Sequence, residues 1–237
     1  AAHAFGCAHN GRFIGSFGAA EVFSFHATKF FNTFEGGAVT TNDDALVEKL
    51  RLMQNFGFEK LDTVTYIGTN GKMSEISAAM GLTGLDSLDE FLAVNQRNYH
   101  LYLDGLDGIP GLTVFRFKTN ERNNYQYIVL ELDEAICGLS RDRMVALLHA
   151  EQVRVRRYFY PACHKMEPYR SYFPHAGLLL AHTERLVERV MTLPTGTAVT
   201  PADVAHICQL IRFILDNADA INQKWAQHQM GATPQHD

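Results

Sequence analysis

Residues 24–37, SFHATKFFNTFEGG, constrain the fold of this chain more than any other segment. They begin at the end of a short aromatic and β-branched run, residues 22–25, which is typical of a buried strand. They end in two glycines, which adopt positive φ without steric cost, and a second strand is predicted at residues 38–41. One lysine, Lys29, therefore lies between two predicted core strands, where a flexible cation is uncommon.

Composition indicates a globular chain with a core of ordinary size. Of the 237 residues, 46% are hydrophobic, which is enough for one large or two smaller domains. The net charge is −5 and the basic residues are scattered, so we expect neither nucleic acid nor a membrane as a partner. The four cysteines form no C-x-x-C pair, which argues against a disulfide framework or zinc ribbon and favours the reducing cytoplasm.

Apolar periodicity predicts several further elements. A helix capped at Thr41 or Asn42 is predicted to end near Gln54, with a loop at residues 56–69. Residues 87–106 are predicted to form a long connecting helix, and a turn cluster follows at residues 107–111. The other predicted helices cover residues 73–85, 141–150, 183–191 and 201–217, and the other predicted strands cover residues 125–132 and 153–160.

Spacing alone allows two interpretations of Lys29. A loop lysine can extend its ammonium group to water while its stem covers a phenylalanine. A desolvated lysine can instead attack a carbonyl and form a Schiff base, and strand ends are where open α/β sheets place ligands. The neighbours favour the second interpretation: Ser24 offers a hydroxyl to a phosphate, and His26 is close enough in sequence to exchange a proton. A phosphate-bearing aldehyde would use all of these groups.

Four segments occur in the order of the motifs of a known family. They are AAHAFG at residues 1–6, FSFHATK…EGGAVTTND at residues 23–43, GTNGKMSEISAAMG at residues 68–81 and RRYFYPACH at residues 156–164. With them the chain resembles the DegT/DnrJ/EryC1/StrS family of pyridoxal-phosphate sugar aminotransferases. The resemblance extends over nearly the whole chain except its tail.

The resemblance implies an α/β fold, the PLP-dependent transferase fold type I. It implies the C-terminal part of the large mixed-sheet domain followed by a smaller α+β C-terminal domain, with the N-terminal part expected to be absent. We expect residues 1–86 to belong to the cofactor-binding large domain and residues 87–107 to form the connecting helix. Residues 108–226 would then form the small domain, and residues 227–237 a disordered tail.

The resemblance also implies roles for individual residues. Lys29 matches the lysine that forms the internal aldimine with pyridoxal 5'-phosphate and then moves a proton between substrate and cofactor. Ser24 matches the phosphate-binding serine, and Asn70 an asparagine that reaches the phosphate from the partner subunit, which implies a homodimer with shared active sites. Ala2 would let the cofactor ring lie flat, and His3 would approach its phenolic oxygen.

Four other positions bear on the site. His26 is expected to contact the cofactor, and His164, Tyr160 and Lys72 are substrate-contact candidates. Many family members carry an arginine at the position of Lys72. An aspartate that holds the pyridine nitrogen protonated is expected directly before the segment that begins here with Ala1.

Other constellations have simpler explanations. His3, Cys7 and His9 suggest a zinc site, but their spacing supplies no fourth ligand, so we expect no metal. Cys163 beside His164 suggests a thiol nucleophile, yet adjacent residues on an extended chain point apart. The arginines of residues 154–157 could meet phosphates, although an exposed strand face is the default.

The sequence thus predicts an aminotransferase that moves an amino group from an amino acid, expected to be glutamate, to a nucleotide-linked keto-deoxysugar. Two alternatives stay open. One is a sugar dehydratase or epimerase of the same family, in which a histidine can replace the cofactor lysine. The other is a non-catalytic cofactor-binding homologue. The presence of Lys29 favours transamination.

Overall fold

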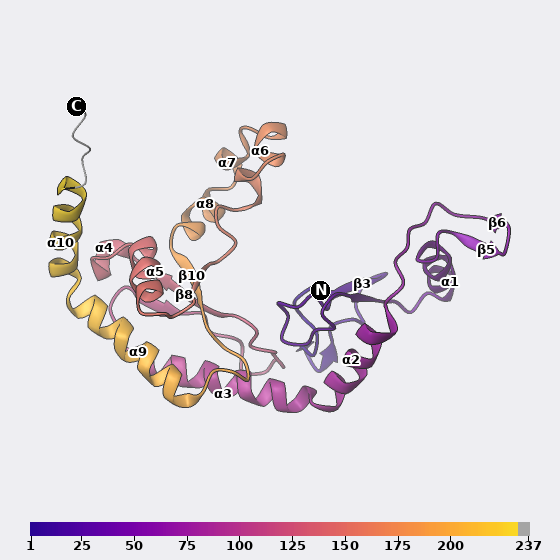
Figure 1. Cartoon of the computed structure of the whole chain (residues 1–237), viewed down its shortest axis with the longest axis horizontal. Helices are drawn as coiled ribbons and strands as arrows, with labels where there is room; N and C mark the ends of the chain where they lie inside the picture. Colours follow the sequence, from indigo (N-terminus) through magenta and orange to yellow (C-terminus); the bar gives the residue numbers. More distant parts are fainter. Residues whose placement is uncertain (232–237) are drawn as a thin grey trace. The chain divides into compact units, whose positions relative to one another are not determined.

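The computed structural model describes residues 1–231, with side chains to residue 227. The chain divides into two compact units, each described here by itself. The first contains residues 1–96 and 117–126, and the second contains residues 97–116 together with the chain from residue 127 onward. Helix α3, Leu88–Leu106, begins in the first unit and ends in the second (Figure 1).

The first unit is built from three short antiparallel strand pairs and two helices, besides the start of α3. The pairs are β1 (Ala8–His9) with β2 (Arg12–Phe13), β3 (Glu21–Ser24) with β4 (Gly37–Thr40), and β5 (Phe58–Lys60) with β6 (Thr63–Val64). The helices are α1 (Asp44–Met53) and α2 (Glu75–Asp86). A cluster of Phe23, Phe25 and Phe31 forms the core, and the Phe5 ring stacks on Phe31 at 4.5 Å between centroids.

The strand pair around Lys29 is confirmed, one residue earlier than predicted at each end. Ser24 lies opposite Gly37 in the ladder, so both strand ends meet beside the lysine turn. A Cβ on Gly37 would lie 2.6 Å from the Phe23 carbonyl oxygen, which explains why only glycine fits there.

Two predictions for the segment that follows were wrong. The N-cap of α1 is Asp43, whose carboxylate accepts from Leu46 N at 3.1 Å, while the Thr41 hydroxyl instead donates to Ala19 O. The predicted loop at residues 56–69 contains the hairpin β5–β6. Its strands are exposed and only two or three residues long, so they carry no apolar alternation that a sequence pattern could detect.

The second unit has a four-stranded antiparallel sheet in the order β7-β8-β10-β9. Its strands are β7 (Leu112–Val114), β8 (Ile128–Leu132), β10 (Val190–Leu193) and β9 (Arg156–Arg157). Ile128, Leu130 and Leu132 alternate along β8 and are fully buried, so one face of the sheet forms the core. Helix α5 (Arg141–Ala150) contacts β9, β10 and helix α9 (Pro201–Asp216).

Helix α9 runs beside the second half of α3 (Figure 1). Arg212 on α9 donates to the carbonyl oxygens of Gly105 at 2.8 Å and Asp107 at 2.9 Å. A Cβ on Gly105 would lie 2.6 Å from Cys208 Sγ, so the glycine permits the close approach of the two helices. The shorter helices are η1 (Cys163–Lys165), α4 (Glu134–Cys137), α6 (Tyr169–Tyr172), α7 (Ala176–Leu179) and α8 (Ala181–Val187).

Helix predictions held where caps marked the ends. Ser140 caps α5 and Thr200 caps α9, the latter in a capping box with Asp203. The helix predicted at residues 183–191 was wrong in its second half: α8 ends at Val187 and a central strand begins at Val190. All four residues of that strand are buried, and a continuous apolar run does not distinguish strand from helix. The strand predicted at residues 153–160 is limited to β9, and that predicted at residues 125–132 begins only at Ile128.

The last helix, α10 (Ala218–Gly231), includes the first five residues of the tail expected at residues 227–237, and the rest of that tail lies outside the described residues. Among residues 1–231, no helix combines the length and apolar character needed to cross a membrane. Among the side chains that the structure describes, those of residues 1–227, histidine, cysteine and acidic residues form no group of three or more suited to hold a metal ion.

Candidate active site

Lys29 lies in a tight turn directly after β3. Its backbone N–H donates to His26 O at 2.9 Å, and two further backbone bonds close the loop, from Thr33 N to Phe25 O and from Phe25 N to Gly36 O. The buried Phe25 and Phe31 rings anchor the loop on both sides of the lysine. The position of the Lys29 backbone is therefore fixed by the core and not by its own side chain.

The Lys29 amine is held against His3. The distance from Lys29 Nζ to His3 Nε2 is 2.8 Å, and both side chains are half-buried. Burial and then the charge of Lys29 lower the pKa of His3, which favours the neutral imidazole. A lysine ammonium can only donate, so in that pair Nε2 accepts.

Ser24 and Ala2 lie next to this pair. Ser24 N donates to Ala2 O at 3.4 Å, and the Ser24 hydroxyl accepts from His26 N at 3.4 Å. The segment that carries Ala2 and His3 is thereby attached to the end of β3. The structure brings together four of the sequence-predicted residues: Ala2, His3, Ser24 and Lys29.

His26 is oriented by the turn itself. Its Nδ1 atom lies 2.9 Å from Thr28 Oγ1, and its Nε2 atom lies 3.5 Å from Glu35 Oε1. Glu35 thus lies beside His26 within the segment that holds Lys29. Contact of His26 with a cofactor stays a prediction.

Two residues that hold the segment carrying His3 were missed by sequence reasoning, Asn124 and Asn95. The Asn124 side-chain amide donates to His3 O at 2.7 Å and to Phe5 O at 3.1 Å, and Asn95 Nδ2 donates to Asn124 O at 3.1 Å. A signal was present for Asn95, since it occupies the apolar stripe of α3 between Leu92 and Tyr99, where a buried polar side chain needs a partner.

Asn70 and Lys72 lie on an exposed segment of the same unit. Asn70 forms a bridge with Asn55, and Gly71 N donates to Gln54 O at 2.8 Å, so the segment is fastened to the end of α1. Lys72 Nζ lies 4.5 Å from the centroid of the Phe56 ring, a cation–π distance. The roles of both residues toward a cofactor or substrate stay predictions.

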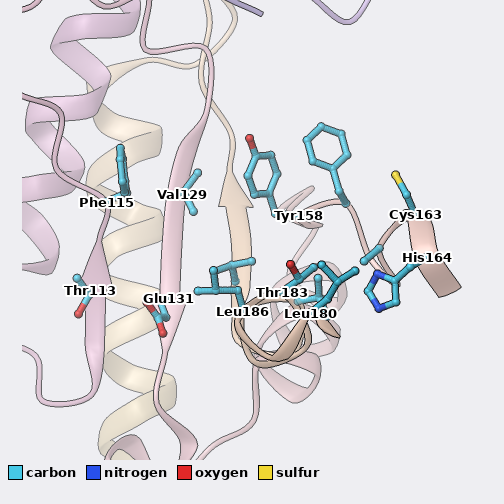
Figure 2. Close-up of a pocket in the computed structure, with 14 residues that line it drawn as sticks. Thr113, Phe115, Val129, Glu131, Tyr158, Cys163, His164, Leu180, Thr183 and Leu186 are labelled. Atoms are coloured by element: carbon cyan, nitrogen blue, oxygen red, sulfur yellow. The ribbon is translucent and has the colours of Figure 1, made fainter. Parts of the chain in front are cut away.

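The other two candidates, His164 and Tyr160, belong to the second unit. His164 lines an apolar pocket of about 670 Å³ on the sheet face opposite the core, where Tyr158 and Cys163 also lie (Figure 2). His164 Nε2 is 2.7 Å from Glu184 Oε1, and hydrogen bonds from Lys165 and then His164 lower the pKa of that carboxyl. His164 is therefore held by a carboxylate at the pocket edge.

Tyr160 faces a different depression, which Arg156 and Arg157 also line. Its ring centroid lies 4.3 Å from the Arg157 guanidinium carbon and 5.1 Å from that of the buried Arg141. Arg156 and Arg157 are exposed on the edge strand β9, which agrees with the exposed strand face expected from the sequence. Tyr160 and His164 thus line two different pockets of the unit.

Comparison with known proteins decides the family. The sequence profile of the DegT/DnrJ/EryC1/StrS aminotransferase family matches residues 1–212. The chain belongs to this family. Within it, the chain is 33% identical over 214 residues to the dTDP-4-amino-4,6-dideoxy-D-glucose transaminase of Shigella dysenteriae, a match that covers 90% of the chain and 58% of the transaminase.

Two solved structures share the fold of this chain. DesI, studied in the presence of its TDP-sugar product, superposes with a TM-score of 0.88 at 47% identity, over 97% of this chain and 57% of DesI. A putative PLP-dependent aminotransferase from Bacillus cereus superposes with a TM-score of 0.77 at 26% identity, over 88% and 56% of the two chains. The chain has the mixed α/β fold of these proteins and spans a little over half of their length.

Proposed function

We propose that this chain is the part of a pyridoxal-phosphate-dependent aminotransferase that carries the cofactor lysine. The observation that supports this most is the Lys29 amine, fixed at the end of a core strand and 2.8 Å from a half-buried histidine. A lysine in such a position is oriented and partly desolvated, which is what a nucleophile toward an aldehyde needs. Membership in an aminotransferase family supports the same reading.

The residues present fit the cofactor. The site combines a primary amine for the aldehyde with a serine hydroxyl at the end of β3, a donor that suits a phosphate. When bound, pyridoxal phosphate supplies an electron sink for the substrate carbanion. Lys29 would hold the cofactor through its aldehyde and would move the proton at the substrate carbon, and Ser24 would hold the phosphate. Ala2, with no bulk beyond Cβ, leaves room for a flat ring.

His3 has a separate task in this proposal. Because its lowered pKa keeps the imidazole neutral, it accepts a hydrogen bond from the lysine ammonium and adds no positive charge to the site. It can also approach the phenolic oxygen of the cofactor. His26, held by Thr28 and Glu35, lies next to the proposed phosphate position.

The working unit is proposed to be a homodimer with shared active sites in the reducing cytoplasm. Asn70 lies on an exposed segment whose backbone is fastened to the end of α1, so its side chain is available to a second subunit. In the dimer it would reach the cofactor phosphate bound by Ser24 of the partner subunit. Residues 1–86 would then belong to the large domain and residues 108–226 to the small one.

The proposed substrates are a nucleotide-linked keto-deoxysugar and an amino-acid donor, with glutamate the expected donor. Support comes from the Shigella relative, named for a dTDP-linked amino sugar, and from DesI, named with a TDP-sugar product. His164, Tyr160 and Lys72 are the proposed substrate contacts.

A donor screen on the full-length, cofactor-loaded protein tests the proposal. Glutamate should convert the visible absorption of the loaded cofactor to that of its amine form, and a nucleotide-linked ketosugar should restore it. Lys29→Ala should show neither change. A cofactor spectrum indifferent to every amino donor would favour the dehydratase or epimerase, and absence of any cofactor spectrum would favour the non-catalytic homologue.

A further inference from the structure

The segment that carries His3 has little regular structure of its own. Residues 1–7 contain two turn-type backbone bonds, from Ala4 N to Ala1 O at 2.9 Å and from Cys7 N to Ala4 O at 3.0 Å. The Phe5 side chain of this segment is fixed, because its ring packs in the phenylalanine core. The His3–Lys29 distance therefore depends on what holds the backbone of residues 3–5.

Asn124, from a distant part of the sequence, holds the backbone of residues 3–5 in place. Its side-chain amide donates to His3 O at 2.7 Å and to Phe5 O at 3.1 Å, so one side chain holds the carbonyl groups on both sides of Ala4. Its Oδ1 atom accepts from Gln126 N at 3.1 Å, which fixes the amide plane and the direction of both donors. Asn124 is only 7% exposed, so these hydrogen bonds are shielded from water.

Asn95 supports Asn124 in turn. Its Nδ2 donates to Asn124 O at 3.1 Å, and the Asn95 side chain is 2% exposed. Because Asn95 lies on α3, this bond ties the returning residues 117–126 to the helix within the same unit. A chain of hydrogen bonds thus runs from α3 through Asn124 to the backbone of His3 and, by its imidazole, to the Lys29 amine.

We propose that Asn124 is a positioning residue for Lys29: it fixes the backbone of His3 so that the imidazole stays against the lysine amine, with Asn95 as its support. The inference rests on the proposed function, in which Lys29 is the reacting amine. Asn124 does not itself touch the amine, and its effect is transmitted only through His3.

The test measures the reactivity of Lys29 in the full-length protein after removal of the cofactor. The protein is treated briefly with acetic anhydride at fixed pH, and the acetylation of Lys29 relative to that of exposed Lys49 is read by peptide mass spectrometry. Asn124→Asp keeps the shape of the side chain but turns carboxylate oxygens toward two carbonyl oxygens. Asn123→Asp is the matched control. Asn123 is the neighbouring residue, and its side chain also donates to a backbone carbonyl, that of Glu121 at 3.2 Å.

Loss of the His3 side chain uncovers the half-buried Lys29 amine and opens it to the reagent, so we expect the ratio to rise roughly three- to tenfold in His3→Ala. Asn124→Asp should give a similar rise, the double variant no more than either, and Asn123→Asp none. A wild-type ratio in folded Asn124→Asp, or in His3→Ala, would overturn the proposal. Should Asn124→Asp not fold, folded Asn95→Ala decides: a smaller rise supports the proposal, and an unchanged ratio contradicts it.

Because the assay needs no cofactor, its outcome is independent of the donor screen. A positioning effect without cofactor binding would reject the proposed function and keep the Asn124–His3–Lys29 relationship. Cofactor binding with unchanged Lys29 reactivity in every variant would keep the proposed function and reject the positioning role of Asn124.

Discussion

Gly68 and Gly57 lie backbone against backbone in the segment that carries Asn70. A Cβ on Gly68 would overlap Gly57 N and Met53 O and would lie 2.6 Å from the carbonyl carbon of Phe56. These obstacles are backbone atoms, which cannot rotate away as a side chain can. The contact fixes the path of residues 68–71, and with it the position of Asn70, the residue that we propose reaches a second subunit.

Gly68→Ala should therefore destabilise the first unit by about 1–3 kcal/mol, the usual cost of forcing atoms into a packed region. Thermal or denaturant unfolding of the full-length protein measures this. Gly71→Ala is the control, since a Cβ there would meet Gln54 at an ordinary 3.5 Å. Equal midpoints for the two variants would contradict the close packing of Gly57 and Gly68.

Shared active sites predict that two inactive variants rescue each other. If Asn70 acts on the partner subunit's cofactor, a mixed dimer of Lys29→Ala and Asn70→Ala has one site with both defects and one intact site. After equimolar unfolding and refolding, about a quarter of the wild-type activity should return, since half of the dimers are mixed. No recovery, with mixed dimers verified by mass spectrometry, would place both residues in one subunit's site.

The helix α9 depends on its cap. Thr200 and Asp203 bond reciprocally, with the Thr200 hydroxyl accepting from Asp203 N at 3.2 Å and Asp203 Oδ2 accepting from Thr200 N at 2.9 Å. Thr200→Ala should destabilise the second unit by about 1 kcal/mol. Thr200→Ser, which retains the oxygen, should stay close to wild type in the same unfolding experiment, and an equal loss in both variants would argue against the cap.

The link between His164 and α8 should weaken in acid. Hydrogen bonds from Lys165 and His164 lower the pKa of Glu184, so its contribution to stability is present above the ordinary value of 4.5 and is lost as pH falls through the lowered value. Glu184→Gln should therefore lower the unfolding midpoint at pH 7 and differ less from wild type near pH 3. A difference that is the same at both pH values would contradict the ion-pair assignment.

Sequence patterns predicted those elements that carry strong local signals. The caps Ser140 and Thr200 marked the starts of α5 and α9, and the apolar stripe of α3 gave its bounds to within a residue. Patterns failed where burial removes periodicity, as in β10, and where strands are too short and exposed to show any, as in β5–β6.

The site was only partly predictable. The motif around Lys29 and Ser24 is local, and the resemblance to known aminotransferases pointed to His3. The Asn124 bonds join residues more than 110 positions apart, so no local pattern encodes them. Asn95, a polar residue within the apolar face of α3, could have indicated a buried partner, but no prediction used it.

The most direct test of the central claim is to find which lysine bonds to the cofactor. Full-length protein loaded with pyridoxal phosphate is reduced with borohydride, digested and examined by peptide mass spectrometry, with Lys29→Ala as the blank. We predict that the reduced cofactor is attached to Lys29 and that the blank carries none. Attachment to another lysine, or no attachment in protein that holds the cofactor, would contradict the account.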